Sequence, residues 1–373
     1  MRARIATFVV IAQTILFLGH WAIYETWLRF GILSPLPPAP LLWLQIAMIV
    51  LSVSFIITST LAFRLSGFAV RISYTIAAAW LGIASYFLFA SLFCWIVLGV
   101  VRAAGLHWNP RWIALTLFGA ALAVSVYGLA NAAWTRVTRI SVKLPNLPES
   151  WRGRVAALVA DTHLGHVRNV RFMRRIVAKL AQLRPDAVFI AGDLYDGTAC
   201  DPSRLAQPWS QLRSPLGAYF ITGNHEEFRD RRQYLDAVEA AGVRVLRNEK
   251  VIVDDLQLIG VLDRESANVN KDGYRDILRR AAIDRERASI LLLHNPHLLA
   301  IAEDAGISLQ LSGHTHGGQF MPWTWLTSRI YGPYVHGLQR FGKMMVFTTW
   351  GAGTWGPPLR VGTNPEIVLI TFE

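Results

Sequence analysis

Five short motifs of carboxylate, amide and imidazole side chains occur in the last two-thirds of this 373-residue chain. In chain order they are Asp161-Thr162-His163, Gly192-Asp193, Gly223-Asn224-His225-Glu226, His294 and Gly313-His314-Thr315-His316. Each follows a short apolar run, and the carboxyl ends of strands are where open α/β sheets place their sites. Oxygen ligands mixed with imidazoles suit Mn, Fe or Zn. Because two such ions about 3.5–4 Å apart need a bridging carboxylate together with oxygen and imidazole ligands, the set predicts a site for two divalent metal ions.

Taken singly, the motifs are weak signals. An Asp-x-His more often caps a loop, a Gly-Asp more often forms a turn, and Asn224 could be the N-cap of a helix. Gly-His-Thr-His is moderately specific for metal by itself, because alternate residues of an extended segment point to one face. The glycines before Asp193, Asn224 and His314 permit tight turns close to the ions. The joint occurrence of all five motifs, each after a strand, carries the prediction.

The residues around the motifs predict a layered α/β domain. Short apolar strands alternate with helical patterns, which is typical of sheets covered by helices. The predicted strands are Val155–Val159, Ala187–Ile190, Ala218–Ile221, Leu256–Val261, Ile290–Leu293 and Leu309–Leu311. Helices are predicted at Phe172–Leu183 and Arg231–Ala241, and the alternating run 140–144 predicts a first or edge strand.

The first part of the chain predicts four membrane-spanning helices. Its apolar segments cover about Ile5–Leu28, Leu41–Phe63, Tyr74–Val101 and Trp112–Trp134. Each reaches the roughly 20 residues that a bilayer crossing needs. The first segment is too long for the apolar core of a signal peptide and lacks a small-x-small cleavage site. We therefore expect a transmembrane domain at residues 1–136 and an α/β domain at residues 137–373.

Charge is distributed unevenly along the chain. The formal net charge is +12, and residues 1–140 contain nine Arg but a single acidic residue, Glu25. These Arg lie between apolar runs and form no stripe, so they indicate membrane flanks and speak against a nucleic-acid partner. With the N-terminus inside, the cytoplasmic segments hold seven Lys or Arg and the opposite loops three. This asymmetry predicts a multi-pass protein of the plasma (inner) membrane with a cytoplasmic catalytic domain.

Together the five motifs resemble the calcineurin-like metallophosphoesterase superfamily over about residues 138–373. The segments Gly317-Gly318-Gln319, Gly351-Ala352-Gly353 and Pro365-Glu366-Ile367 are similar to its membrane-associated bacterial branch, which is related to UDP-2,3-diacylglucosamine hydrolases. The resemblance implies an αββα sandwich of two sheets. One departure is Ala160, where many relatives carry a small hydroxyl residue, and it would alter hydrogen bonds around the ligands but not the ligands themselves.

The resemblance also implies a role for each motif residue. Asp161, His163 and His316 would bind the first ion, Asn224, His294 and His314 the second, and Asp193 would bridge them. His225 matches the superfamily's second-sphere histidine, which stabilises the transition state or protonates the leaving oxygen.

Three charged residues near the motifs, Asp196, Asp263 and Arg264, could orient His225 or a substrate phosphate. A solvated loop charge is the more common situation for such residues, so that interpretation is favoured for all three.

Four further residues are weighed in the same way. His166 could touch a substrate, although a structural role is favoured, and His297 more often begins a helix than binds metal. His20 and Glu25 lie toward the end of the first span. Interfacial or helix–helix contacts are expected of them in preference to a proton path.

The aromatic segment Phe320–Leu326 follows the last motif closely. A buried strand is the favoured interpretation. The rival is an aromatic rim near the site that meets the bilayer or acyl chains, since Trp favours membrane interfaces. Trp350 and Trp355 could belong to the same rim.

Three functional hypotheses remain open. The leading one is a hydrolase of a phosphodiester or pyrophosphate in a lipid-linked or membrane-embedded substrate, because four spans exceed what tethering requires. The second is an anchored phosphodiesterase that acts on soluble nucleotides or other phosphate esters. The third is a sensing or partner-binding membrane module with the phosphoesterase domain as its output. The expected partner is the lipid bilayer, and the sequence specifies neither the oligomeric state nor the residues that bind substrate.

Overall fold

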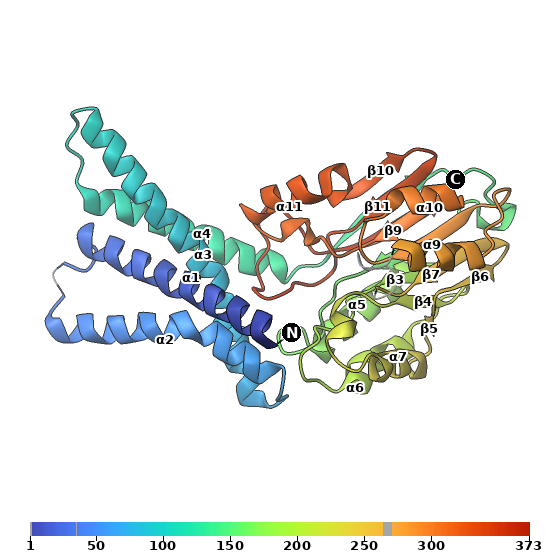
Figure 1. Cartoon of the computed structure of the whole chain (residues 1–373), viewed down its shortest axis with the longest axis horizontal. Helices are drawn as coiled ribbons and strands as arrows, with labels where there is room; N and C mark the ends of the chain where they lie inside the picture. The colour runs from blue at the N-terminus through green and yellow to red at the C-terminus, as the bar shows by residue number, and fades with distance from the viewer. Residues whose placement is uncertain (1, 35, 264–270) are drawn as a thin grey trace. The chain divides into compact units, whose positions relative to one another are not determined.

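The computed structural model describes residues 2–34, 36–263 and 271–373. Contacts between Cα atoms divide the chain into two compact units. Unit 1 holds residues 1–130 with 356–359, and unit 2 holds residues 131–355 with 360–373. Figure 1 shows the helices of unit 1 in blue to cyan and the sheets of unit 2 in green to red.

Unit 1 consists of four long apolar helices. They are α1 (Arg2–Arg29), α2 (Pro38–Ala62), α3 (Phe68–Ala103) and α4 (Pro110–Ala132), whose last two residues belong to unit 2. Within the described residues, all four are long and apolar enough to cross a membrane. Proline opens α2 and α4 because the first N–H of a helix has no partner in any case. The four predicted spans are confirmed as helices, with ends shifted by a few residues.

Polar side chains inside unit 1 pair between or within helices. The indole of Trp80 donates to Nε2 of His20 at 2.8 Å, and His20 Nδ1 donates to the carbonyl of Leu16 at 2.7 Å. Glu25 forms a 2.5 Å ion pair with Arg29, one turn along the same helix. The predicted helix–helix contact is therefore confirmed for His20, whereas Glu25 is paired within α1.

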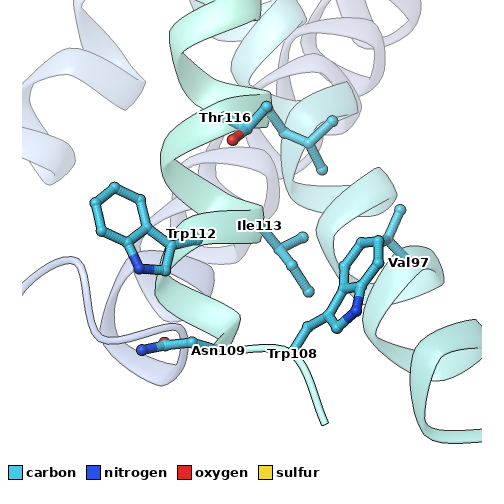
Figure 2. Close-up of a pocket in the computed structure, with 7 residues that line it drawn as sticks. Val97, Trp108, Asn109, Trp112, Ile113 and Thr116 are labelled. Atoms are coloured by element: carbon cyan, nitrogen blue, oxygen red, sulfur yellow. The ribbon is translucent and has the colours of Figure 1, made fainter. Parts of the chain in front are cut away.

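A pocket of about 460 Å³ lies among side chains of α3, α4 and the loop between them (Figure 2). It is lined by Val97, Trp108, Asn109, Trp112, Ile113, Thr116 and Leu117. Trp108 and Trp112 are both exposed and flank the N-terminal end of α4. This position suits a membrane–water interface, where Trp is common.

The first sheet of unit 2 has six strands in the order β1-β12-β2-β3-β4-β5. Their bounds are β1 (Arg136–Val142), β2 (Val155–Val159), β3 (Ala187–Ala191), β4 (Ala218–Ile221), β5 (Arg244–Val245) and β12 (Glu366–Phe372). From β2 to β5 the neighbours are parallel, and β12 is antiparallel to β2 but parallel to β1. The edge strand predicted around residues 140–144 is confirmed as β1.

The second sheet has six strands in the order β10-β11-β9-β8-β7-β6. Their bounds are β6 (Glu249–Val253), β7 (Leu256–Val261), β8 (Ser289–Leu293), β9 (Leu309–Ser312), β10 (Gly337–Phe341) and β11 (Met344–Thr348). The central neighbours are parallel, and the edge strands β6 and β10 are antiparallel to theirs.

Helices cover the outer faces of both sheets (Figure 1). α5 (Val170–Leu183), α6 (Pro202–Ala206) and α7 (Arg231–Ala240) lie on the first sheet, and α9 (Lys271–Arg280) and α10 (Leu299–Ala305) on the second. Ala157 and Val159 of β2 pack toward α5 and α7, whereas Ala156 and Leu158 pack between the sheets. This alternation follows from the two-residue period of a strand. Unit 2 is therefore the predicted αββα sandwich.

The segment Phe320–Leu326 differs from the favoured prediction. After Phe320 the chain forms α11 (Trp323–Tyr331), in which no residue is buried. Phe320 makes an isolated bridge to Val361, and the sheet edge next to β11 is already occupied by β10. The prediction of a buried strand is therefore wrong, because no place in either sheet is left for this segment.

Candidate metal centre

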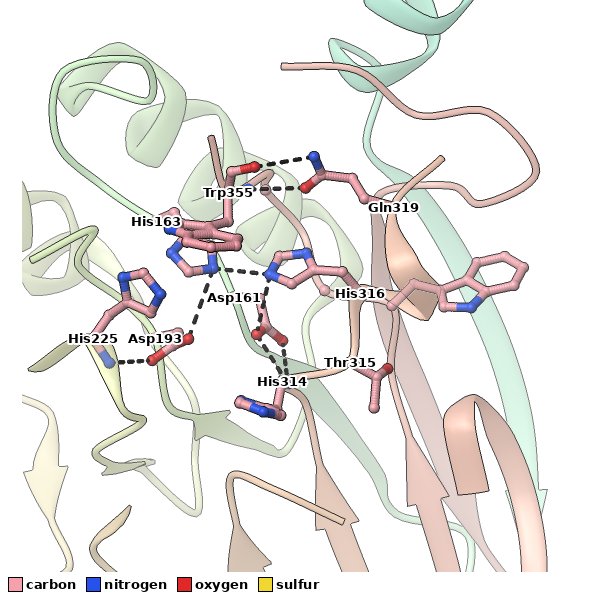
Figure 3. Close-up of polar contacts among 12 residues, drawn as sticks. Asp161, His163, Asp193, His225, His314, Thr315, His316, Gln319 and Trp355 are labelled. Carbon is pink, nitrogen blue, oxygen red and sulfur yellow. Dashed lines mark hydrogen bonds and ion pairs between the residues drawn. The ribbon is translucent and has the colours of Figure 1, made fainter. Parts of the chain in front are cut away.

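The predicted site residues all lie just beyond the carboxyl ends of strands. Asp161 and His163 follow β2, Asp193 follows β3, Asn224 and His225 follow β4, His294 follows β8, and His314 and His316 follow β9. These strands come from both sheets, and the structure brings the seven predicted donors together. Figure 3 shows Asp161, His163, Asp193, His314 and His316 of this set, with His225 beside them.

One group of donors consists of Asp161, His163 and His316. The two Nε2 atoms of His163 and His316 lie 2.9 Å apart, and His316 Nε2 lies 3.5 Å from Oδ1 of Asp161. All three side chains are buried. Two ligands that each lie about 2.1 Å from an ion are roughly 3.0–3.4 Å apart, so this spacing fits a bound cation.

A second group surrounds His294 and His314. Nδ1 of His314 lies 2.9 Å from Oδ1 of Asn224 and 3.3 Å from Nε2 of His294. His294 Nε2 is also 3.2 Å from Oδ2 of Asp193. The Nδ1 of His294 is bonded to the carbonyl of Ala191 at 2.7 Å, which leaves its Nε2 for the site.

Asp193 connects the two groups. Its Oδ2 lies 3.2 Å from Nε2 of His294 in the second group and 3.8 Å from Nε2 of His163 in the first. Its Oδ1 accepts the backbone N–H of His225 at 2.9 Å, which fixes the carboxylate in place. A single oxygen that faces both groups is what a bridging ligand between two ions requires.

The backbone around the donors is strained. Five of the seven have a positive φ, namely Asp161 (53°), His163 (47°), Asp193 (50°), His314 (71°) and His316 (49°). Each such residue costs of order 1–3 kcal/mol, and they persist where the surrounding structure enforces them, often at functional sites. Two neighbouring positions accept only glycine. A Cβ on Gly223 would overlap a carboxylate oxygen of Asp193, and a Cβ on Gly313 would overlap one of Asp161.

Burial controls the protonation of the imidazoles. It holds the pKa values of His163 and His316 well below the usual range and lowers the pKa of His314 to about 3. These rings are therefore neutral at pH 7 and have a lone pair for a cation. Burial also lowers the pKa of His294, but the charge of Asp193 outweighs it and raises the pKa well above its usual value. A cation bound at Nε2 of His294 would take the place of that proton.

His225 stands beside the first group. Its ring centroid is 4.6 Å from that of His163, and its donor nitrogen is close enough to form a third group with His163 and Asp193. Its Nδ1 donates to the backbone carbonyl of Asp196 at 2.9 Å, so Nε2 is left for chemistry. Its second-sphere role remains a prediction.

Two of the charged candidates are not solvated. Asp196 and Asp263 are both buried, so the favoured interpretation is wrong for them. Burial raises the pKa of Asp196 well above its usual value. Oδ1 of Asp196 lies 3.8 Å from Nδ1 of His163, so it lies behind a predicted ligand. Arg264 lies outside the described residues.

The two extra histidines have structural partners. His166 is buried and its Nδ1 lies 3.1 Å from Oγ1 of Thr198. His297 donates to the carbonyl of Asn295 at 3.0 Å, shortly before α10, and belongs to none of the three donor groups found among the described residues.

The tryptophans near the site differ in exposure. Trp350 is half-buried and stacks on His336 at a centroid distance of 3.7 Å. Trp355 is exposed, and its ring lies 5.7 Å from that of His225. Gln319 holds it through hydrogen bonds to its backbone N–H and carbonyl at 2.9 and 3.0 Å (Figure 3).

Two residues that support the donors were not predicted. Glu226 was noted only as part of its motif, yet its buried carboxylate accepts the N–H groups of Asp193, Tyr195 and Gly223. Its place directly after His225 is a signal that could have drawn attention to it.

The other is Arg360, which no sequence signal marks. Its side chain is completely buried and donates to the carbonyls of His316, Trp350 and Gly353 at 2.7–2.8 Å. Its Nη2 also lies 3.0 Å from Nδ1 of His316. Because a guanidinium can only donate, Nδ1 of His316 accepts this hydrogen bond, which fixes the orientation of the ring.

Comparison with known proteins agrees with this geometry. Residues 155–318 match the family model described as calcineurin-like phosphoesterase. The chain is 34% identical to a zebrafish (Danio rerio) transmembrane protein with metallophosphoesterase domain over 264 residues, which are 67% of this chain and 60% of that protein. It is 31% identical to a metallophosphoesterase of Campylobacter jejuni, over 64% of this chain and 63% of that protein.

A metallophosphoesterase of Aquifex aeolicus is 29% identical over 68% of this chain and 97% of that protein. The chain thus spans about 60% of the length of the first two relatives and nearly all of the third. With its donors at the strand ends of a two-sheet sandwich, the domain that carries them is similar to the calcineurin-like phosphoesterase family over residues 155–318.

Proposed function

We propose that this chain is a metal-dependent phosphoesterase that uses two divalent ions. The observation that carries the proposal is Oδ2 of Asp193, which faces His163 in one donor group and His294 in the other. Asp161, His163 and His316 would hold the first ion, Asn224, His294 and His314 the second, and Asp193 both. Such ions lower the pKa of a bound water and neutralise charge on a phosphoryl group.

The chain's own residues would supply orientation and a proton. Because Nδ1 of His225 is bonded to the Asp196 carbonyl, the ring presents Nε2 toward the donors. When a water oxygen forms a bond to phosphorus and the ester bond breaks, the departing oxygen needs a proton. Protonated His225 can give one from Nε2, a general-acid step that typically contributes about 10²–10⁴-fold to rate.

We further propose that the substrate is a phosphodiester or pyrophosphate in a lipid-linked or membrane-embedded molecule. The motifs shared with the membrane-associated bacterial branch support this, as do the four candidate spans. The exposed ring of Trp355 beside His225 offers a surface for an apolar substrate group. On the loop charges, the catalytic domain would be on the cytoplasmic side of the plasma membrane.

The test is phosphate release by the purified full-length protein in lipid nanodiscs. Membrane phospholipids, lipid A precursors, nucleotides and an aryl phosphodiester are compared with Mn²⁺ or after chelation. Preference for a lipid substrate supports the full proposal. Equal turnover of soluble esters without lipid preference points to an anchored general phosphodiesterase, and no turnover with no effect of Mn²⁺ on melting points to a membrane module with an inactive domain.

The metal proposal has its own control. Asp193→Asn should lose bound metal and turnover, whereas Asp272→Asn, at a side chain 95% exposed, should keep both. Metal content measured by mass spectrometry separates the two. Normal turnover in metal-free Asp193→Asn protein would rule out the two-ion site.

A further inference from the structure

Helix α11 exposes an apolar surface that nothing in unit 2 covers among the described residues. Trp323, Leu326 and Ile330 have exposures of 45%, 44% and 68%, and Trp325 reaches 58%. Trp323, Leu326 and Ile330 are spaced i, i+3 and i+7, so they share one face of the helix. A nine-residue helix is marginal by itself in water, and exposed apolar faces of this kind mark interaction sites.

The helix is fixed to the loop that carries the last ligands. A Cβ on Gly318 would overlap the backbone of Trp323 and Thr324, so the start of α11 lies directly on the turn after His316. The preceding residue Met321 donates its N–H to the carbonyl of Val361 at 3.1 Å. The position of α11 therefore follows that of the metal-site loop and of residues near 361.

The same segment near 361 also holds the end of the last candidate span. The side chain of Asn131 donates to the carbonyls of Arg360 and Thr363, both at 3.0 Å. The guanidinium of Arg168 bonds the carbonyl of Ala132, the last residue of α4, at 2.6 Å. Within unit 2, the loop around residue 361 therefore holds two segments. One is the end of the fourth candidate span, and the other is the residue before α11.

The chemistry of the helix suits a lipid surface. Trp and Leu or Ile on one face, with Arg nearby, are typical of helices that lie in the membrane interface. The guanidinium of Arg329 lies 5.2 Å from the ring centroid of Trp325, an arrangement in which the charge can reach headgroups while the ring enters the boundary. The described part of α11 carries no acidic residue that anionic lipids would repel.

We propose that α11 is a membrane-docking helix, which inserts Trp323, Leu326 and Ile330 into the interface of the bilayer that the four spans cross. Docking of α11 would also act on the candidate metal site. The ring of Tyr331, the last residue of α11, lies 6.1 Å from that of His314. Docking therefore holds the rim of the metal centre at the lipid surface. The proposal concerns binding and does not depend on hydrolysis.

The test measures depth in the bilayer. Full-length protein with Cys94 and Cys200 replaced by Ala is given a single new cysteine, Ile330→Cys, and a polarity-sensitive fluorophore. It is reconstituted in nanodiscs of phosphatidylcholine and phosphatidylglycerol with or without doxyl-labelled lipid. The matched control is Ile252→Cys, an isoleucine 53% exposed in edge strand β6.

The label at 330 should lose most of its fluorescence in doxyl lipid, because an interfacial helix buries its apolar face about 5–10 Å into the headgroup boundary. The label at 252 should keep its fluorescence. Leu326→Glu should restore the fluorescence at 330 without a change in melting temperature, because Leu326 is exposed. A label at 330 that stays bright overturns the proposal and indicates a protein partner. Quenching that Leu326→Glu leaves unchanged overturns it as well, because tethering alone would then explain the proximity.

Discussion

Replacement of Glu226 by Gln should weaken metal binding without removal of a ligand. Oε2 of Glu226 accepts the N–H groups of Asp193 and Gly223 at 3.0 and 2.7 Å, and Oε1 accepts that of Tyr195 at 2.9 Å. This carboxylate joins the loop after β3 to the loop after β4. In Glu226→Gln the amide oxygen can keep the first two bonds, but the amide NH₂ then faces the N–H of Tyr195.

The magnitude follows from the lost acceptor. One buried N–H without a partner costs about 1–3 kcal/mol. For a domain of this size each kcal/mol lowers Tm by about 2–4 °C, so a loss of roughly 2–12 °C is expected. Because Glu226 also positions the backbone of Asp193, affinity for Mn²⁺ should fall about 10–100-fold, as for other losses of hydrogen bonds behind a ligand.

The assay compares melting and Mn²⁺ titration of the purified full-length variants. Glu239→Gln is the control, since Glu239 lies on α7 in an exposed ion pair with Arg247 at 2.8 Å. An exposed pair contributes at most about 1 kcal/mol, so Tm should change little and Mn²⁺ affinity not at all. If Glu226→Gln melted and bound Mn²⁺ like the control, the argument that this carboxylate positions Asp193 would be refuted.

Three further predictions concern the same site. His225→Ala should lower kcat by about 10²–10⁴-fold while the bound metal is retained. If the variant lost its metal together with its activity, His225 would instead be a metal ligand. Arg360→Met leaves three buried carbonyls without donors and should lower the free energy of unfolding by about 3–9 kcal/mol. Arg360→Lys should recover part of this loss. Equal stability of the two variants in denaturant titration would show that the hydrogen bonds are unimportant. In chelator, stability should fall as pH rises from about 7 to 8. Burial raises the pKa of Asp161 to about 7 and that of Glu226 to about 8, so the folded state retains protons that the unfolded chain has released, whereas the buried histidines with lowered pKa values are neutral in both states in this range. A stability that rises across this window would contradict those shifts.

The sequence determined the parts of this protein that depend on local pattern. The four spans were predicted because unbroken apolar runs of this length have no other stable environment. The strands that end at the motifs were predicted within one residue, since short apolar runs between turn residues leave few alternatives. The order of the motifs along the chain was enough to indicate which side chains would converge.

Other features of the fold were invisible to local pattern. β12, the last strand, lies between β1 and β2, and its position is set by pairing across more than 200 residues. Segment 320–326 was predicted from its composition to be a buried strand, but its environment is decided by which sheet edges are already occupied.

The metal centre shows the same division. The resemblance of the motifs to a known superfamily implied seven donors, but only the tertiary structure shows that one oxygen of Asp193 faces both groups. Asp196 has the sequence context of a solvated loop charge, yet it is buried behind His163. Arg360 reaches His316 from 44 residues away. The physical reason is that hydrophobic periodicity specifies which face of an element is buried, whereas burial and hydrogen bonding of a polar loop residue depend on whichever distant loops pack over it.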